Sequence, residues 1–318
     1  MSDLQRLLGY REPIFNASMA GAAGGALAAA VSAAGGVGMI GVPAAPAEDW
    51  IQSQASYVSE LETPWGVGFM GWALEENLKP LEAFLEYGPS LVTISFGDVT
   101  RGAALAHEAG VLTAMQIGNA EDLERAMADD IDIIIARGAE GGGHGRNEVG
   151  TLPLLQLACS QHQKPVIAAG GIGTAHGIAA ALAGGADAAW VGTRFLSTTE
   201  ATGHANLKAA VRESGMDDTI YTRAFDIAQQ LPWEPQYGGR ALSNDFSRRY
   251  AADLDSLQAT DELREKMKQA RAEADVSLAP VYAGQAVEFV REEQSAAAVM
   301  EELRSFRRIL AETAQRFA

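Results

Sequence analysis

The chain has 318 residues and a formal net charge of −17, from 24 Lys and Arg against 41 Asp and Glu. Its length fits one barrel-sized domain or two ordinary ones, and its 47% hydrophobic and 20% charged content is that of a globular protein rather than a disordered one. The acidic excess argues against a nucleic-acid partner and against an anionic membrane surface. A bound anion must therefore be held by local backbone amides or by a few cations.

The cysteine content and the distribution of apolar residues further narrow the class of protein. The single cysteine, Cys159, excludes an internal disulfide and a cysteine-based zinc site. The N-terminal residues show no apolar signal core, and no run of about 18 apolar residues occurs. We therefore expect a cytoplasmic protein without a membrane span.

Short β-rich runs alternate with alanine-rich helical stretches from residue 13 to about residue 200. The expected strands are 13–17, 37–41, 65–69, 90–96, 111–116, 131–137, 165–169 and 186–192. Several of these runs are almost continuously apolar, which is typical of parallel strands covered on both faces. Eight strand–helix units predict an α/β fold, a (β/α)8 TIM barrel, with helices that include 25–34, 75–87, 120–129 and 175–183.

The composition changes after Phe195. Residues 200–275 are polar and charged, and we expect them to form a helical insertion or lid after the eighth strand. A long amphipathic helix over about 295–317 is expected to pack back on the barrel. The predicted division is a barrel of residues 1–199 and 276–318, with the insertion between its two parts.

Glycines cluster where strands six, seven and eight end, at 138 and 141–145, at 170–173 and at 192. In a barrel these ends share the face that carries the active site, and the loops after strands seven and eight commonly bind phosphate through backbone amides. The pattern predicts a phosphate site at 170–173 and 192–194, with Arg194 as a charged donor. Ordinary turn chemistry is the alternative explanation for paired glycines. A dinucleotide fingerprint fails because His176 replaces its third glycine, and no phosphate-binding P-loop motif is present.

His144 is the candidate catalytic residue. It lies in the glycine loop 140–145 after strand six, on the face of the proposed ligand site, and a histidine there can act as general base or acid. A solvated loop histidine is the alternative. His107 and His162 are expected to be solvated on outer helical segments. No histidine or carboxylate spacing indicates a metal site, so none is expected.

These features together resemble the nitronate monooxygenase family, FMN-dependent TIM barrels related to flavin-dependent enoyl-acyl-carrier-protein reductases and NADH:quinone reductases. The similarity covers most of the chain. It is carried by the segments PIFNASMAG (13–21), LAAAVSAAGGVG (27–38), EGGGHG (140–145), PVIAAGG (165–171), GTRFL (192–196) and YAGQ (282–285).

The resemblance implies an FMN site and a role for each matching residue. His144 falls on the family's catalytic histidine. The phosphate would be held by Gly170, Gly171, Gly192 and Thr193, and Gln116 lies where the family places a polar or basic flavin contact. The remaining residues implied to line the cofactor are Ala17, Ser18, Met19, Gly142, Gly143, Ala169, Gly284 and Gln285.

Three positions depart from the family pattern. Ser18 replaces the usual proline before the methionine, Gly68 replaces the asparagine common on strand three, and Arg137 stands where related sequences often have glutamine or aspartate. Because these positions surround the substrate side of the expected flavin, they bear on the substrate more than on the cofactor.

The leading hypothesis is an oxidoreductase that oxidises alkyl nitronates or nitroalkanes with molecular oxygen, with His144 as general base or anion-binding group. One alternative is an NAD(P)H-dependent FMN reductase of quinones or enoyl thioesters. Others are a non-catalytic flavin- or phosphate-binding barrel and a phosphosugar enzyme without flavin. The substrate is expected to be a small molecule. A homo-oligomer is possible on the sequence alone. The role of residues 200–275 is open, and their Trp233 and Tyr237 are candidates either for a substrate wall or for aromatic packing.

Overall fold

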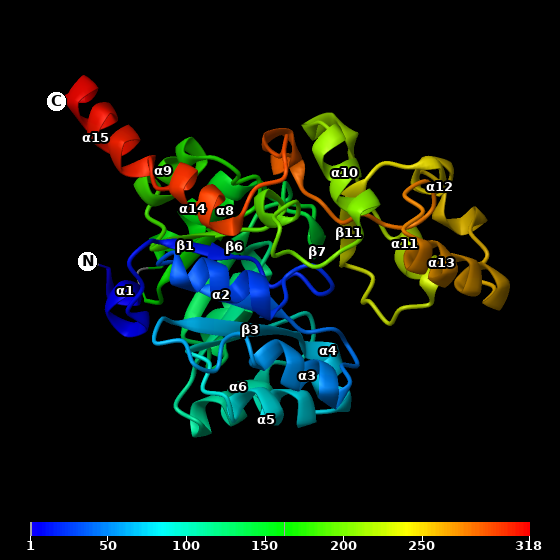
Figure 1. Cartoon of the computed structure of the whole chain (residues 1–318), viewed down its shortest axis with the longest axis horizontal. Helices are drawn as coiled ribbons and strands as arrows, with labels where there is room; N and C mark the ends of the chain where they lie inside the picture. The colour runs from blue at the N-terminus through cyan, green and yellow to red at the C-terminus, as the bar shows by residue number, and fades with distance from the viewer. Residues whose placement is uncertain (1, 162) are drawn as a thin grey trace.

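A computed structural model of the chain describes residues 2–161 and 163–318, so His162 lies outside the described residues. The eight expected barrel strands are present as β1 (Ile14–Asn16), β2 (Gly38–Gly41), β3 (Trp65–Met70), β4 (Leu91–Ser95), β5 (Leu112–Ile117), β6 (Ile133–Arg137), β8 (Val166–Ala169) and β9 (Ala188–Val191). They form one parallel sheet in the order β1-β9-β8-β6-β5-β4-β3-β2. A parallel bridge between Phe15 and Val37 links β1 to β2 and closes the sheet into a nearly complete barrel (Figure 1). The predicted (β/α)8 fold is confirmed.

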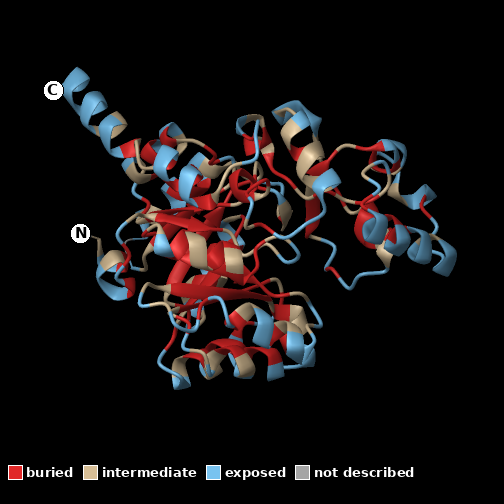
Figure 2. Cartoon of the chain, viewed as in Figure 1, coloured by how far each residue is buried: buried red, intermediate tan, exposed pale blue. Residues whose placement is uncertain are grey.

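Helices cover the outside of the barrel, and its strands are buried on both faces (Figure 2). These helices are α2 (Gly25–Ala33), α3 (Glu48–Ala55), α4 (Gly71–Glu76), α5 (Lys79–Leu85), α6 (Thr100–Glu108), α7 (Ala120–Ala128), α8 (Thr151–Ser160) and α9 (Ala175–Ala183). The short helix α1 (Asp3–Leu8) packs Leu4 and Leu8 into the cluster that holds Phe15 and Ile133. It therefore covers the end of the barrel interior opposite to the carboxyl ends of the strands.

The single helix expected over 75–87 is two helices in the structure, α4 and α5. Asn77 has an extended backbone, with φ −155° and ψ 113°, and Pro80 lies in the first turn of α5. A proline in a first helical turn loses no intrahelical hydrogen bond, so it favours a new helix start rather than a continued helix.

The segment after β9 contains strands as well as helices, contrary to the expectation that it is helical. It contains α10 (Ala205–Glu213), α11 (Ala224–Gln229), α12 (Asp245–Tyr250) and α13 (Asp261–Glu273), but also the strands β10 (Thr219–Thr222) and β11 (Gly238–Leu242). Strand β11 pairs antiparallel with β10 on one side and with β7 (Gly143–Gly145) on the other. Because β7 belongs to the loop after β6, this small sheet joins the inserted segment to the barrel (Figure 1).

The expected C-terminal helix is divided into α14 (Ala296–Leu303) and α15 (Phe306–Phe317). Helix α14 buries Val299, Met300 and Leu303 against the barrel, whereas only Phe306 of α15 is buried. Helix α15 leaves the barrel beside α9 and projects from it, with most of its surface exposed (Figures 1 and 2).

Candidate active site

The segments after β1 and β9 lie side by side at the carboxyl ends of the strands. The Ala17 N–H donates to the Val191 carbonyl at 2.8 Å. A Cβ atom built on Gly192 would lie 3.4 Å from Ala17 Cβ and 3.5 Å from Met19 Sδ. These two predicted cofactor segments are therefore neighbours, and the backbone at Gly192 keeps room beside it.

The turn after β8 requires glycine at two successive positions. Gly170 and Gly171 have φ values of +103° and +69°, a region that side chains disfavour. A Cβ on Gly170 would also lie 2.6 Å from Thr151 Oγ1. The turn leads into α9, whose N-cap residue Thr174 accepts a hydrogen bond from the Gly177 N–H. Because the first amides of a helix have no intrahelical acceptor, this turn places backbone donors where an anion can approach.

The loop after β6 packs backbone to backbone on the segment around Gly284. The Gly284 N–H donates to Thr193 Oγ1 at 2.9 Å, and the Gln285 N–H donates to the Glu140 carbonyl at 3.0 Å. A Cβ on Gly142 would lie 2.4 Å from the Gly284 nitrogen. The structure therefore brings these predicted residues together, and close packing accounts for the glycines at 142 and 284.

Three further predicted residues are placed by backbone or ion-pair contacts. Ala169 ends β8 and accepts a hydrogen bond from the Gly138 N–H at 2.9 Å. The Gln116 N–H, near the end of β5, donates to Ser95 Oγ at 3.0 Å. Arg194 is buried, and its Nη2 contacts Glu302 at 2.6 Å and Gln294 at 2.7 Å. The predicted charged donor is therefore already engaged by Glu302 of α14 and by Gln294.

The predicted glycines at 143, 171 and 192 are less closely packed than those at 142, 170 and 284. A Cβ on Gly143 would meet no heavy atom within 4 Å, and Gly171 is exposed. At Gly192 the nearest atoms lie at ordinary van der Waals distances. Glycine backbones beside helix-terminal amides are a setting that suits a phosphate group.

His144 was expected to lie in a loop, but it lies in a short strand. It is the central residue of β7, directly opposite Gly239 of β11. Its Nε2 lies 2.8 Å from Asp226 Oδ1, and its ring stacks on Trp233 with centroids 3.7 Å apart and an angle of 4°. The Tyr282 ring centroid lies 5.1 Å away. The imidazole is therefore held in one orientation, with 11% of its side chain exposed.

No sequence pattern indicated Asp226, and Tyr282 stood out only as the first residue of the YAGQ segment. Asp226 lies in the first turn of α11 and is only 2% exposed. Its Oδ1 also lies 3.5 Å from the Tyr282 hydroxyl. Burial, followed by the negative charge of Asp226, raises the pKa of the Tyr282 phenol far above its usual value. The only sequence signal for Asp226 is an acidic residue among apolar ones on a short helix.

An aromatic cluster covers the histidine. Trp233 is buried and makes edge-to-face contacts with Trp72 at 5.5 Å and with Phe96 at 5.1 Å. Tyr237 contacts Phe96 in the same way at 5.1 Å. Phe96 adopts a φ of +68°, which is unusual for an aromatic residue and marks a locally strained turn after β4. The cluster thus joins the ends of β3 and β4 to the inserted segment, next to His144.

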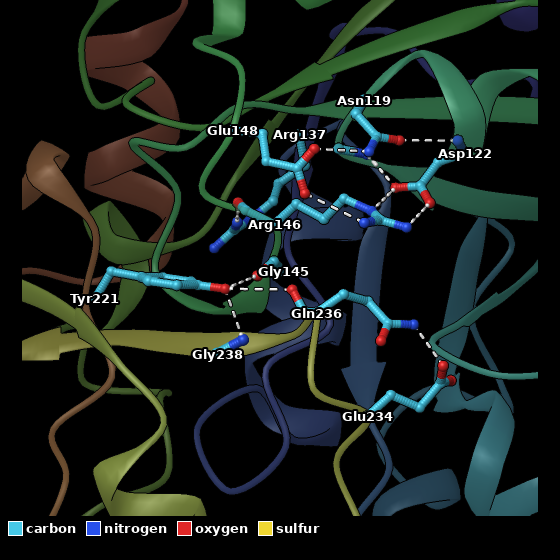
Figure 3. Close-up of polar contacts among 11 residues, drawn as sticks. Asn119, Asp122, Arg137, Gly145, Arg146, Glu148, Tyr221, Glu234, Gln236 and Gly238 are labelled. Atoms are coloured by element: carbon cyan, nitrogen blue, oxygen red, sulfur yellow. Dashed lines mark hydrogen bonds and ion pairs between the residues drawn. The ribbon is translucent and has the colours of Figure 1, made fainter. Parts of the chain in front are cut away.

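A buried ion pair fixes the strand that carries His144 (Figure 3). Arg146 binds both carboxylate oxygens of Asp122 at 2.9 Å and lies 5.5 Å from the centre of the Tyr237 ring. Burial opposes its charge, but the hydrogen bonds and charge of Asp122 outweigh burial, so the pKa of Arg146 is raised. Tyr221 adds a second link, because its hydroxyl donates to the Gly145 carbonyl at 2.9 Å and accepts from the Gly238 N–H at 2.7 Å.

Arg137, one of the departures from the family pattern, lies beneath the glycine loop. Its Nη2 donates to the carbonyls of Gly141, Gly142 and Gly143 at 2.6, 3.1 and 3.0 Å. Burial, reinforced by the charge of Arg240, lowers the pKa of Arg137 to about 10. The guanidinium is thus used to shape the loop that carries His144.

The other two departures are in contact with each other. A Cβ on Gly68 would lie 2.3 Å from Ser18 Oγ, 2.4 Å from Ser18 Cβ and 2.6 Å from Thr93 Oγ1. Ser18 therefore occupies space that a larger residue at 68 would need. The two changes are spatially coupled.

Among the described residues, no helix is long and apolar enough to cross a bilayer. Within residues 2–161 and 163–318, no group of three or more His, Cys, Asp or Glu side chains is placed to hold a metal ion.

Known proteins of two kinds share this architecture. FabK from Thermotoga maritima superposes with a TM-score of 0.86 at 27% identity, covering 100% of this chain and 99% of that one. The nitroalkane oxidase from Streptomyces ansochromogenes gives 0.79 at 27% identity, with both chains fully covered. A nitronate monooxygenase from Neurospora crassa is 30% identical over 209 residues, 62% of this chain and 54% of that protein.

The chain spans about half the length of the curated relatives it matches, with 54% of the Neurospora crassa protein and 46% of a nitronate monooxygenase from Paraburkholderia phytofirmans covered. The family model for nitronate monooxygenase matches residues 42–305, which include His144, both glycine turns and the whole inserted segment. The chain therefore belongs to the nitronate monooxygenase family.

Proposed function

We propose that this enzyme binds FMN and oxidises alkyl nitronates or nitroalkanes with molecular oxygen, with His144 at the reacting carbon. The observation that carries the proposal is a single buried imidazole, held by Asp226 and Trp233, at the strand ends beside the glycine turns. The family and the nitroalkane oxidase neighbour support the substrate class.

In this proposal, separate backbone segments bind the parts of the cofactor. Amides at Gly170, Gly171, Gly192 and Thr193 would bind the phosphate, which suits a chain whose net charge of −17 offers an anion little long-range attraction. The ring system would lie along the backbone of 17–19, with Gln116 and the 284–285 segment at its edges. When bound, FMN supplies the capacity to accept an electron pair from the substrate and pass it to oxygen.

The chain's own contribution is proton transfer, charge placement and exclusion of water. With a neutral nitroalkane, His144 removes the proton on the α-carbon; with a preformed nitronate, the protonated imidazole attracts the anion. The Trp72 indole, whose Nε1 is buried without an acceptor among the described residues, packs edge-to-face against Trp233. Trp233 stacks on the imidazole and Phe96 packs against Trp233, and this aromatic cover limits access by water.

Residues 200–275 serve in this proposal as the cover of the substrate side. Both Asp226 and Trp233 come from this segment, and both touch His144. The contacts leave little space beside the imidazole, with 11% of its side chain exposed. We therefore expect small nitronates to be preferred over bulky ones.

Oxygen consumption by the purified, FMN-loaded protein tests the proposal. We expect saturable oxygen uptake with small alkyl nitronates and a loss of at least about 100-fold with neutral nitroalkanes in the His144→Gln variant. Matched flavin absorbance in the two proteins controls for cofactor content. Rapid bleaching of the flavin by NADH or NADPH, with no oxygen uptake on any nitronate, would instead establish a reductase.

A further inference from the structure

Asp226 is an unusual residue to bury in the inserted segment. Its side chain is 3% exposed, Oδ1 faces His144, and Oδ2 has no hydrogen-bond partner among the described residues. A carboxylate taken out of water with half of its acceptor capacity unused destabilises a fold unless a specific charge or hydrogen bond offsets the cost. Here the close partners of Oδ1 are the His144 ring and, at longer range, the Tyr282 hydroxyl.

The chain on either side of Asp226 is closely packed. Ala224 and Phe225 precede it in the first turn of α11 and are buried in the core of the inserted segment, where Phe225 contacts Phe246. The carboxylate is therefore set by packing rather than by a mobile loop. A group fixed in this way can orient the residue that it touches.

Two aromatic rings and a carboxylate restrain the orientation of the His144 ring. Trp233 lies flat against one face, and Tyr282 approaches at a tilt of 51°. A Cβ on Gly239, the residue opposite in β11, would lie 3.5 Å from Nε2 and 2.6 Å from the Tyr282 ring. With Nε2 at the carboxylate, the other ring nitrogen, Nδ1, has no partner among the described residues and is not sealed from solvent.

We propose that Asp226 is a positioning residue that keeps the proton of neutral His144 on Nε2, so that Nδ1 is the nitrogen that receives the α-proton of a nitroalkane. The inference rests on the proposed function. In the step, the α C–H bond breaks, its electron pair stays on the substrate as the nitronate, and the proton forms a bond to Nδ1. The positive charge that arises on the imidazole faces the Asp226 carboxylate. A preformed nitronate needs no such transfer.

The kinetic test compares two substrates in one variant. Asp226→Asn keeps the size of the side chain but removes its charge. We expect kcat with a neutral nitroalkane to fall by about 100-fold or more, because general-base catalysis contributes roughly 10²- to 10⁴-fold, while kcat with the preformed nitronate falls by less than about tenfold. Asp245→Asn, at an exposed aspartate of the same segment, is the matched control and should leave both values unchanged. Equal losses with both substrates in Asp226→Asn would overturn the proposal.

The spectroscopic test needs no turnover. In ¹⁵N-histidine-labelled, FMN-loaded protein, the His144 resonances are assigned by comparison with His144→Gln, and their shifts report which nitrogen carries the proton. We expect neutral His144 in the wild type to be protonated on Nε2, and Asp226→Asn to lose this preference. A wild-type ring protonated on Nδ1 would overturn the proposal even if Asp226→Asn fails to fold.

The two tests separate the two proposals. A wild type that oxidises nitroalkanes, with unchanged substrate discrimination and an unchanged tautomer in Asp226→Asn, overturns the role of Asp226 alone. A wild type that oxidises neither nitroalkanes nor nitronates overturns the proposed function, and with it the assignment of Nδ1 as the proton acceptor.

Discussion

Asp226 Oδ1 lies 2.8 Å from His144 Nε2, although 82 positions separate the two residues in the chain. One belongs to the inserted segment and the other to the loop after β6, and the β7–β11 pairing holds these two parts together. The environment of the histidine is therefore complete only when the inserted segment is folded against the barrel.

Adding a single methyl group at Gly239 should lower the activity. In Gly239→Ala the new methyl group would lie 2.6 Å from the Tyr282 ring, which must shift and disturb His144. We expect kcat to fall by roughly 10- to 100-fold, as displacements of about 1 Å in an active site can cause, with flavin content unchanged. Steady-state oxygen uptake measures the effect. Gly177→Ala is the control, because its Cβ meets nothing closer than 3.5 Å; an equal loss there would contradict the steric explanation.

Arg146 should contribute more to stability than an exposed arginine does. Arg146→Met would leave Asp122 buried without its counter-charge, so the free energy of unfolding should fall by about 3–5 kcal/mol. Arg248→Met breaks an exposed ion pair with Asp245 and should cost at most about 1 kcal/mol. Urea denaturation of the three proteins gives the comparison. Similar losses of unfolding free energy in both variants would show that the Arg146–Asp122 pair contributes no more to stability than an exposed ion pair does.

Ser18 and Gly68 should show a strongly non-additive response. Gly68→Ala alone places a methyl group 2.3 Å from Ser18 Oγ, so we expect a lower melting temperature and a lower flavin content. Ser18→Gly removes the atoms in closest conflict and should restore part of both losses in the double variant, with Thr93 limiting the recovery. Thermal unfolding and the ratio of flavin to protein absorbance measure the cycle. Purely additive effects would show that the two positions act independently.

Asp132 should contribute to stability in a pH-dependent way. Burial opposes its charge, but hydrogen bonds from the Thr113 N–H and from His107 outweigh burial and lower the pKa of Asp132 below its usual 3.8. A carboxyl group with a lowered pKa in the folded state adds stability above its unfolded-state pKa and loses that contribution as the pH falls through the folded-state value. Wild type should therefore be more stable than Asp132→Asn at pH 7, and the difference should shrink below about pH 4. A constant difference in unfolding free energy across this range would contradict the assignment.

The barrel was predictable because its signal is local. Continuous apolar runs such as that of β6 indicate strands covered on both faces, and their regular alternation with helices leaves few other folds. The sequence pattern failed where structure depends on distant partners. β7 consists of two glycines around His144, and it is a strand only because β11 pairs with it. For the same reason the inserted segment looked helical throughout.

The candidate site was predictable only in part. The clustered glycines and His144 follow strand ends, so the fold alone places them on one face. Asp226 could not be predicted, since nothing in its local sequence relates it to a histidine 82 residues earlier. The position of Arg194 also depends on a distant residue, Glu302, which binds its guanidinium. Side-chain partners of this kind are set by tertiary packing, so they produce no periodic pattern in the sequence.

The most direct test of the central claim is anaerobic reduction of the bound flavin in a stopped-flow spectrophotometer. A small alkyl nitronate should bleach the flavin of the wild-type protein within the turnover time, and a neutral nitroalkane should do so only when His144 is present. NADH should reduce the flavin far more slowly than the nitronate does. Bleaching by NADH alone, with the flavin unchanged by any nitronate, would contradict the account.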